Sequence, residues 1–351
     1  MQGSVERIRT LLAGGKPDRP PLFDLIPNDA ILTHFNGGKP VEPGDDASGI
    51  AAFARAIDGT RTCRLSPHKE YSETLSDGRQ RRWERWTTWT EDRKFASSEE
   101  FARVKKREMA ELVAAADRLD VSANEMYRQQ RRHFDWFAGQ AMYLPDWPGT
   151  GFMGIYVEVG LEEFSYYLAD CPGTIVEILE AKTYFAEKWA AGLPADDPFD
   201  ALFTGVDMAY KNGLMVSPAW LREHYIPRLR RVVDAFHKRG KKLMWHSDGD
   251  INAILDDLVD AGIDMLNPIE VQANMDLADL HRRYPKLIFA GGIDVSDLLP
   301  HGTPQQVRDA VVKAIEDTEG KIMVGSSTEL FDTVPLENFL AMRETVMGYK
   351  L

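Results

Sequence analysis

The stretch Lys242-Leu243-Met244-Trp245-His246-Ser247-Asp248-Gly249-Asp250 runs from a short apolar segment into a polar turn. A continuous apolar run bounded by polar residues is typical of a strand buried on both faces. After Asp250, aliphatic side chains recur at helical spacing as far as Gly262. The sequence therefore predicts a strand, a loop and a helix in succession, which is the repeating unit of an α/β protein.

The same order recurs through the C-terminal half of the chain. Four further short β-rich runs alternate with amphipathic helical patterns, at residues 201–204, 263–266, 287–290 and 321–324. Strands that alternate with helices in this way predict a parallel sheet with right-handed crossover connections.

Capping residues mark the starts of two of these helices. Ser217 and Thr303 each precede a proline that suits the first helical position, and Gln306 completes a capping-box pattern with Thr303. Pro227 interrupts the apolar pattern of residues 221–236. It predicts a short helix followed by a longer one, or a kink.

Three earlier runs, at residues 21–25, near 61–65 and at 152–159, bring the number of candidate strands to eight. Eight such units in 351 residues favour a (β/α)8 TIM barrel, with residues 1–351 forming a single α/β domain. A doubly wound open sheet is the alternative architecture, but no glycine-rich phosphate turn follows the first strand.

Residues 66–140 interrupt this order. Asp77-Gly78 is a strong two-residue turn signal and predicts a hairpin within residues 71–90, with several tryptophans on its return arm. We expect residues 66–140 to be an insertion that lies over one mouth of the barrel.

The composition excludes several classes of function. Fifty-five acidic residues against 42 basic ones give a net charge of −13, which disfavours binding to nucleic acid or to an anionic membrane. No apolar run reaches the ~18 residues that a membrane span needs, and no signal peptide is recognised, so we expect a cytoplasmic protein. Cys63 and Cys171 are too few for a disulfide framework or a cysteine-only zinc site.

Polar side chains follow the predicted strands, where a barrel places its working face. These candidates are Asp207, His246, Asp248, Asn267, Glu270, Asp294 and Glu329. His246 and Asp248 lie two residues apart at a strand end and point the same way, so the pair can hold a divalent ion, orient a proton or bind a heterocycle. A zinc site would need a third ligand from Glu270, Glu329 or Asp207.

Five stretches of the C-terminal half carry a family resemblance: residues 244–251, 261–270, 275–277, 290–294 and 334–338. Together they resemble the uroporphyrinogen decarboxylase superfamily. This superfamily contains the decarboxylases of haem synthesis and the methyltransferases that move methyl groups to or from corrinoid proteins. The resemblance implies a (β/α)8 barrel and one of these two activities.

Two departures from the family patterns help to choose between the branches. The decarboxylases share an arginine-rich stretch after the first strand, and residues 21–29 contain no arginine. The methyltransferases that charge a thiol share a His-x-Cys pair and a later Cys that bind zinc. Here His246 matches, but Asp248 stands at the first cysteine position and Ser326 near the second. Zinc is therefore disfavoured, and His246 and Asp248 would hold any metal that binds.

The resemblance favours a methyltransferase that moves a methyl group between a small molecule and a corrinoid (cobalamin) carried by a partner protein. A methyl ether or tetrahydrofolate would serve as the methyl donor or acceptor. The expected catalytic residues are His246, Asp248 and Asp207. The expected substrate-binding residues are Glu270, Asn267, Asp294 and Glu329. The open alternatives are a porphyrinogen decarboxylase and a non-catalytic barrel that binds a tetrapyrrole or a pterin, and a homo-oligomer is compatible with all of them.

Overall fold

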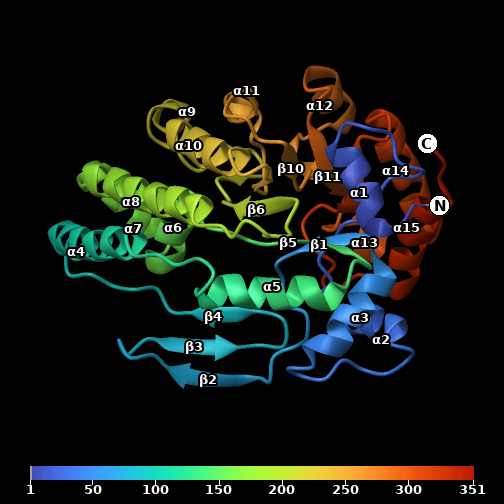
Figure 1. Cartoon of the computed structure of the whole chain (residues 1–351), viewed down its shortest axis with the longest axis horizontal. Coiled ribbons are helices and arrows are strands. Elements are labelled where there is room, and N and C mark those ends of the chain that lie inside the picture. Colours follow the sequence, from blue (N-terminus) through green and yellow to red (C-terminus); the bar gives the residue numbers. More distant parts are fainter. Residues whose placement is uncertain (1) are drawn as a thin grey trace.

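The structure is a computed structural model and describes residues 2–351. Its framework is parallel β-structure surrounded by helices (Figure 1). The larger parallel sheet has the order β12-β11-β10-β9-β6. Its strands are β6 (Ala201–Gly205), β9 (Lys242–His246), β10 (Met265–Asn267), β11 (Ile288–Ile293) and β12 (Ile322–Ser326). The five strands predicted in the C-terminal half are therefore confirmed.

A second parallel sheet pairs β1 (Gly59–Arg61) with β5 (Met142–Leu144). Three single backbone bridges connect these parts of the chain. Leu22 pairs with Val324 of β12, Phe23 pairs with Gly59 of β1, and Asp146, which follows β5, pairs with Phe203 of β6. The chain is thus an α/β protein with parallel strands, as expected. A closed eight-stranded barrel is not present as one continuous hydrogen-bonded sheet, because several of its expected strands are short or reduced to single bridges.

The predicted strand at residues 152–159 is wrong: these residues form the helix α6 (Phe152–Val159). Its buried residues Phe152, Ile155, Tyr156 and Val159 follow the three- and four-residue spacing of a helical face. The strand that precedes it, β5, contains only three residues and was missed. The strand predicted near residues 61–65 lies slightly earlier, as β1.

Helices cover the outside of the parallel strands (Figure 1). Those of the first half are α1 (Ser4–Leu12), α2 (Asp29–Phe35), α3 (Asp46–Ala56), α4 (Ser98–Ala116), α5 (Glu125–Phe137), α7 (Leu161–Asp170) and α8 (Pro172–Ala191). Those of the second half are α9 (Pro218–Trp220), α10 (Ile226–His237), α11 (Leu255–Asp260), α12 (Leu277–Arg283), α13 (Leu298–His301), α14 (Pro304–Asp317) and α15 (Leu336–Gly348). Helices α4, α8 and α10 pack side by side, and α14 packs against α15.

The predicted helix starts are confirmed. Thr303 and Gln306 form a capping box at the start of α14, and the Ser217 side chain accepts a hydrogen bond from the Trp220 N–H at the start of α9. Between α9 and α10 lies one π-helical turn, Leu221–Tyr225. The expected break at Pro227 is therefore present just before that proline, which lies in the first turn of α10.

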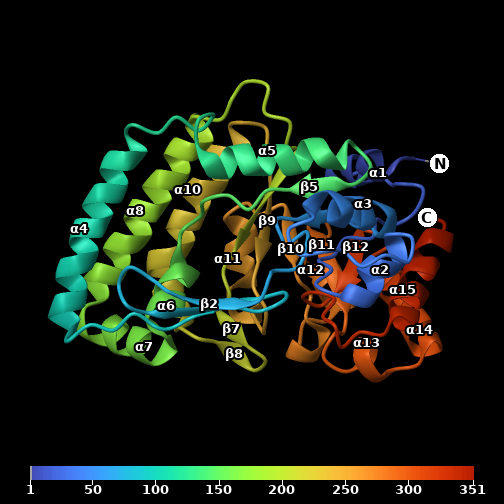
Figure 2. The same cartoon turned by 90° about the horizontal axis from the view of Figure 1, so that it is seen from below.

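The predicted hairpin is confirmed and has a third strand. Strands β2 (Tyr71–Thr74), β3 (Gln80–Trp83) and β4 (Thr88–Thr90) form an antiparallel sheet, and Asp77-Gly78 lies in its first turn. Figure 2 places this sheet on the same side of the molecule as α6, α7 and the small hairpin of β7 (Ala209–Tyr210) and β8 (Gly213–Leu214). An ion pair between Arg85 and Asp29 ties it to the start of α2. That residues 66–140 form an insertion in a single domain stays a prediction.

A small apolar cluster is formed by residues of the parallel strands together with residues of α1. It includes Phe203, Met244, Met265 and Met323, which alternate along their strands with residues that face the helices. Helix α1 contributes Ile8 to this cluster and contacts β1 and β5. None of the helices within residues 2–351 is long and apolar enough to span a membrane.

Candidate active site

His246 is the last residue of β9, and its imidazole is oriented by the neighbouring strand. Asn267 ends β10 and lies opposite His246 in the strand register. Its Oδ1 accepts a hydrogen bond from His246 Nδ1 at 2.9 Å, and its Nδ2 donates to the carbonyl oxygen of Ala290 at 3.5 Å. Because both ends of the buried amide are engaged, the imidazole turns Nε2 toward the loops that follow the strands.

Asp207 follows β6 and faces this nitrogen. Its Oδ1 lies 3.3 Å from His246 Nε2 and accepts a hydrogen bond from the Asp248 N–H at 3.2 Å. Burial alone would raise the pKa of Asp207, but the hydrogen bond and charge of His246 outweigh it and hold the pKa below its ordinary value. His246 and Asp207 therefore form an imidazole–carboxylate pair.

Asp248 is the second carboxyl beside the imidazole, with Oδ1 4.0 Å from His246 Nε2. This oxygen is buried and has no hydrogen-bond partner within residues 2–351, although the side chain as a whole is 39% exposed. Burial, together with the negative charges of Asp207 and Glu270, raises the pKa of Asp248 to about 6. A carboxyl of this kind can carry a proton near neutral pH and deliver it.

Glu270 holds the loop that carries Asp248. Its Oε2 accepts a hydrogen bond from the Gly249 N–H at 2.8 Å. Gly249 has φ +86°, and a Cβ there would lie 2.6 Å from the carbonyl carbon of Ala209, so only glycine fits. The side chain of the next residue, Asp250, accepts a hydrogen bond from the Asn252 N–H at 3.1 Å and so fixes the turn that follows.

Arg61, the last residue of β1, is a cation within this acidic cluster that the sequence analysis missed. Its guanidinium lies over the Phe203 ring at 4.1 Å from the ring centre, and its Nε is buried without a hydrogen-bond partner in the described chain. The charge of Arg61 lowers the pKa of Asp207 and opposes the raised pKa of Asp248. It also opposes the raised pKa of Glu329, which has burial as its main cause.

Three further residues belong to the site and were not predicted. Asp146 follows β5, its backbone N–H donates to the Thr62 hydroxyl at 2.7 Å, and the charges of Arg61 and His246 act on its carboxylate. The Tyr156 hydroxyl donates to the carbonyl oxygen of Asp207 at 2.7 Å. Asp24 follows the bridging residues 22–23 and accepts hydrogen bonds from the N–H and the hydroxyl of Ser326, and burial raises its pKa to about 7.

Asp294 is not brought into this cluster by any contact of its carboxylate. The side chain accepts hydrogen bonds from the backbone N–H groups of Ser296, Asp297 and Leu298, at 3.0–3.1 Å. It therefore caps its own loop. The predicted residues that the structure joins by direct contacts are His246, Asp207, Asp248, Asn267 and Glu270, while Glu329 is linked to them through charge.

The ligand atoms of Asp207, His246 and Asp248 lie within 4.8 Å of one another and could hold a metal ion. The unpartnered Oδ1 of Asp248 fits such a role, whereas Asp207 already bonds to the Asp248 N–H and faces His246. Ser326 adds no ligand, because its hydroxyl donates to Asp24. Burial raises the pKa of the Cys63 thiol to about 12, so a thiolate is disfavoured there. The donor set is one imidazole and two carboxylates.

The region from β6 to α15 carries all of the directly joined residues. Residues 203–349 match the uroporphyrinogen decarboxylase (URO-D) family model. The resemblance expected from the sequence is thereby confirmed for this region. The match includes β6, β9 and β10, whose ends carry Asp207, His246 and Asn267.

One similar solved structure extends the likeness in fold to the whole chain. A methyltransferase from Methanosarcina mazei is similar over 99% of this chain and 99% of its own, with a TM-score of 0.64 and 14% sequence identity. A B12-independent methionine synthase from Shewanella sp. W3-18-1, in complex with selenomethionine, is similar over 94% of this chain and 98% of its own, with a TM-score of 0.47 and 13% identity. No curated protein matched the chain.

Proposed function

We propose that this protein is a methyltransferase of the uroporphyrinogen decarboxylase superfamily, which moves a methyl group between a small molecule and a corrinoid carried by a separate protein. The observation that carries the proposal is Asp248, a carboxyl with a pKa of about 6 beside the His246–Asp207 pair. The family match and the fold shared with a methyltransferase support it.

The proposal includes a (β/α)8 barrel as the scaffold of the site. The three single bridges support it, because they link residues 22–23, the β1–β5 pair and the five-stranded sheet into one circuit. In this arrangement Arg61, Asp146, Asp207 and His246 all lie at the carboxyl ends of their strands. The antiparallel sheet β2-β3-β4 would then cover the mouth, held there by the Arg85–Asp29 ion pair.

The residues of the chain act on the heteroatom that the methyl group leaves. A methyl ether oxygen or an amine nitrogen gains negative charge as its methyl bond breaks, and protonation by Asp248 stabilises it. The corrinoid on the partner protein supplies the centre that accepts the methyl group. In the reverse direction, the Asp248 carboxylate would take the proton from an acceptor, and Asp207 would keep the imidazole of His246 in place.

The charges of the site favour a neutral or cationic methyl donor. Asp207, Asp248, Glu270 and Glu329 face a single guanidinium, that of Arg61, which influences three of these carboxyls. A porphyrinogen with many carboxylates would meet repulsion from this cluster. A methyl ether or a folate-bound methyl group needs no cationic cleft at the reacting centre.

The decarboxylase is the second candidate, and one observation favours it. The buried Nε of Arg61 has no partner within residues 2–351 and could donate to a substrate carboxylate. The same arrangement would suit a barrel that binds a tetrapyrrole or a pterin without turnover.

One experiment separates these candidates. The purified protein is mixed with a methoxy-substituted aromatic compound and reduced cobalamin, and methylcobalamin formation is followed by its absorbance. A parallel sample receives uroporphyrinogen, and carbon dioxide release is measured. We expect methylcobalamin in the first sample, and formation slower on the order of a hundredfold in the His246→Gln variant. Carbon dioxide release without methyl transfer, or binding without either reaction, would overturn the proposal.

A further inference from the structure

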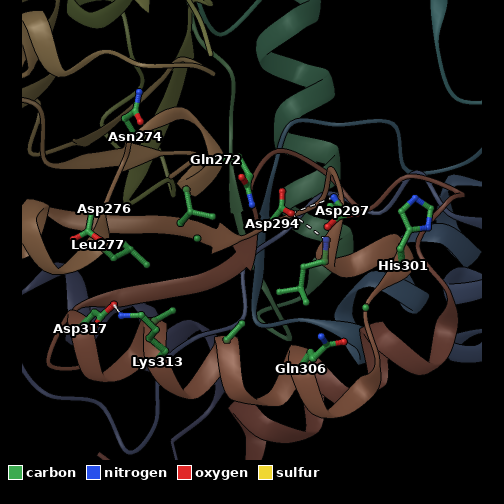
Figure 3. Close-up of a pocket in the computed structure, with 16 residues that line it drawn as sticks. Gln272, Asn274, Asp276, Leu277, Asp294, Asp297, His301, Gln306, Lys313 and Asp317 are labelled. Atoms are coloured by element: carbon green, nitrogen blue, oxygen red, sulfur yellow. Dashed lines mark hydrogen bonds and ion pairs between the residues drawn. The ribbon is translucent and has the colours of Figure 1, made fainter. Parts of the chain in front are cut away.

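A cavity of about 690 Å³ lies outside the parallel strands, between α12, α13 and α14 (Figure 3). A space of this size accommodates a small organic molecule. Gly292 of β11 forms part of its wall, and the missing side chain at this position helps to leave the space open. Neither His246 nor Asp248 lines it, so this cavity is distinct from the candidate active site.

The cavity has an apolar wall and an acidic rim. The apolar lining comes from Val271, Leu277, Leu298, Ala310 and Ala314. Four carboxylates also line the cavity, those of Asp276, Asp294, Asp297 and Asp317, whereas Lys313 contributes one ammonium group. This excess of negative charge favours a cationic ligand.

Most of these carboxylates are already engaged. Asp317 pairs with Lys313 at 2.6 Å, Asp276 accepts a hydrogen bond from the Asp279 N–H, and Asp294 caps its own loop. The Asp297 side chain is exposed to solvent, and no hydrogen bond or ion pair within residues 2–351 engages its carboxylate. Figure 3 shows it at the end of the cavity opposite Lys313 and Asp317.

Two neighbours of Asp297 are also free to bind a ligand. The side chains of Gln272 and His301 line the solvent-exposed part of the same cavity and make no hydrogen bond to any residue that the structure describes. Figure 3 shows Gln272 close to Asp294 and Asp297, with His301 beyond them. The cavity therefore offers an open carboxylate, an amide and an imidazole at one end of an apolar surface.

The loop of residues 270–276 joins this cavity to the candidate active site. Val271 and Gln272 line the cavity, while Glu270 accepts the hydrogen bond from the Gly249 N–H beside Asp248. Asn274, which also lines the cavity, donates from Nδ2 to Asp250 Oδ2 at 3.2 Å. A ligand seated against this loop would restrain the segment that carries Asp248.

We propose that the cavity binds a small amphipathic cation, in which a protonated amine pairs with Asp297 and an apolar body lies against Leu277, Leu298 and Ala310. Occupancy of the cavity stiffens the loop of residues 270–276 and, through Glu270, the Gly249 segment. This second site is tested by ligand binding alone. The outcome of that test is therefore independent of whether the protein transfers methyl groups.

Phenethylamine is the probe, and phenethyl alcohol is its uncharged control. Isothermal titration calorimetry with the full chain at pH 7 should show saturable binding of the amine and about tenfold weaker binding of the alcohol. Asp297→Asn should remove this preference, and Ala310→Trp should fill the cavity and abolish binding. Asp309→Asn, an exposed substitution on the same helix as Ala310, is the matched control and should bind like the wild type.

The link to the active site is tested by hydrogen exchange. Phenethylamine should slow exchange of the Gly249 amide in the wild type and leave it unchanged in Asp297→Asn, whose fold is checked by its thermal melting. Equal affinity for the amine and the alcohol, no saturable binding of the amine, or binding that survives in Ala310→Trp would overturn the site. Unaltered Gly249 exchange at saturation would overturn the link.

Discussion

The 2.9 Å hydrogen bond between His246 Nδ1 and Asn267 Oδ1 decides which nitrogen of the imidazole faces the carboxylates. An amide oxygen only accepts, so Nδ1 carries a proton. Nε2 then lies 3.3 Å from Asp207 Oδ1. The strand register that sets Asn267 beside His246 thus determines which ring nitrogen faces Asp207 and Asp248.

Asn267→Ala should disturb this arrangement first. The buried Nδ1–H loses its acceptor, which costs about 1–3 kcal/mol of unfolding free energy. The freed ring should lower kcat with little change in KM, since Asn267 positions His246 and does not itself react. Urea denaturation and steady-state kinetics measure the two effects. Asn36→Ala, at an exposed hydrogen bond to the Lys39 carbonyl, should change neither by a comparable amount.

His246→Gln and Asp248→Asn should each lower turnover on the order of a hundredfold, the effect expected when a positioned proton donor or its neighbour is lost. Both substitutions retain the approximate shape of the side chain, so the melting temperature should stay within a few degrees of the wild type. Asp196→Asn at an exposed position is the control for loss of one negative charge. Full activity in both site variants, or unfolding of both, would contradict the assigned roles.

The rate of methyl removal should fall above about pH 6, because Asp248, with a pKa of about 6, then loses the proton that it donates. The positive charge of Arg61 opposes the raised pKa of Asp248. Arg61→Gln should therefore raise the pKa further and move the decline to higher pH. Single-turnover rates between pH 5 and 9 measure this shift, with Arg103→Gln on the exposed side of α4 as the control. A decline that moved to lower pH would count against Asp248 as the acid.

Asp24 should make the protein less stable as the pH rises through the range from about 4 to about 7. The unfolded chain releases this proton near the ordinary value of 3.8, whereas burial raises the pKa of Asp24 to about 7 in the folded protein. The folded state binds more protons in this range, so the unfolding free energy falls with rising pH. At about 1.4 kcal/mol for each pH unit, the loss approaches about 4 kcal/mol.

Asp24→Asn removes this titration. The difference in unfolding free energy between the wild type and Asp24→Asn, measured by urea denaturation at pH 5 and pH 8, should therefore change by a few kcal/mol in favour of the variant at pH 8. An identical pH dependence in both proteins would show that Asp24 ionises in the folded state as it does in the unfolded chain.

Activity should not depend on zinc. The thiol ligands of the zinc-binding family pattern are absent here, and the Asp207 carboxylate faces His246 and accepts from the Asp248 N–H. We expect elemental analysis of the purified protein to find far less than one equivalent of zinc, and turnover to survive treatment with EDTA. Stoichiometric zinc in the wild type that is lost in His246→Gln would reverse this expectation.

The sequence predicted the centre of the site because the strands that carry it are long enough to recognise. β6 and β9 each have five residues and contain a continuous apolar run, so Asp207, His246 and Asp248 could be found from their positions after those runs. Arg61 and Asp146 follow β1 and β5, which have three residues each. A strand of three residues is too short to show an alternation of apolar and polar side chains. The residue at its end therefore cannot be assigned to the site from the sequence.

Other differences have separate physical causes. Residues 152–159 are apolar at several successive positions, so the run suits either a strand or a buried helix, and packing against the neighbouring elements decides in favour of α6. Asp294 stands after a strand, where a ligand-binding residue and a loop cap look the same in sequence. In the structure, three backbone N–H groups donate hydrogen bonds to its carboxylate, so Asp294 is a loop cap.

Gly249 also couples the loop that carries Asp248 to the β7–β8 hairpin. Its lack of a side chain lets it press against the backbone of Ala209, while the Asp250 N–H donates to the Tyr210 carbonyl at 2.9 Å and the Met208 N–H to the Ser247 hydroxyl at 3.1 Å. The β7–β8 hairpin is therefore interlocked with the loop that bears Asp248. The exposed ring of Tyr210 is therefore carried by a hairpin whose position is fixed relative to Asp248.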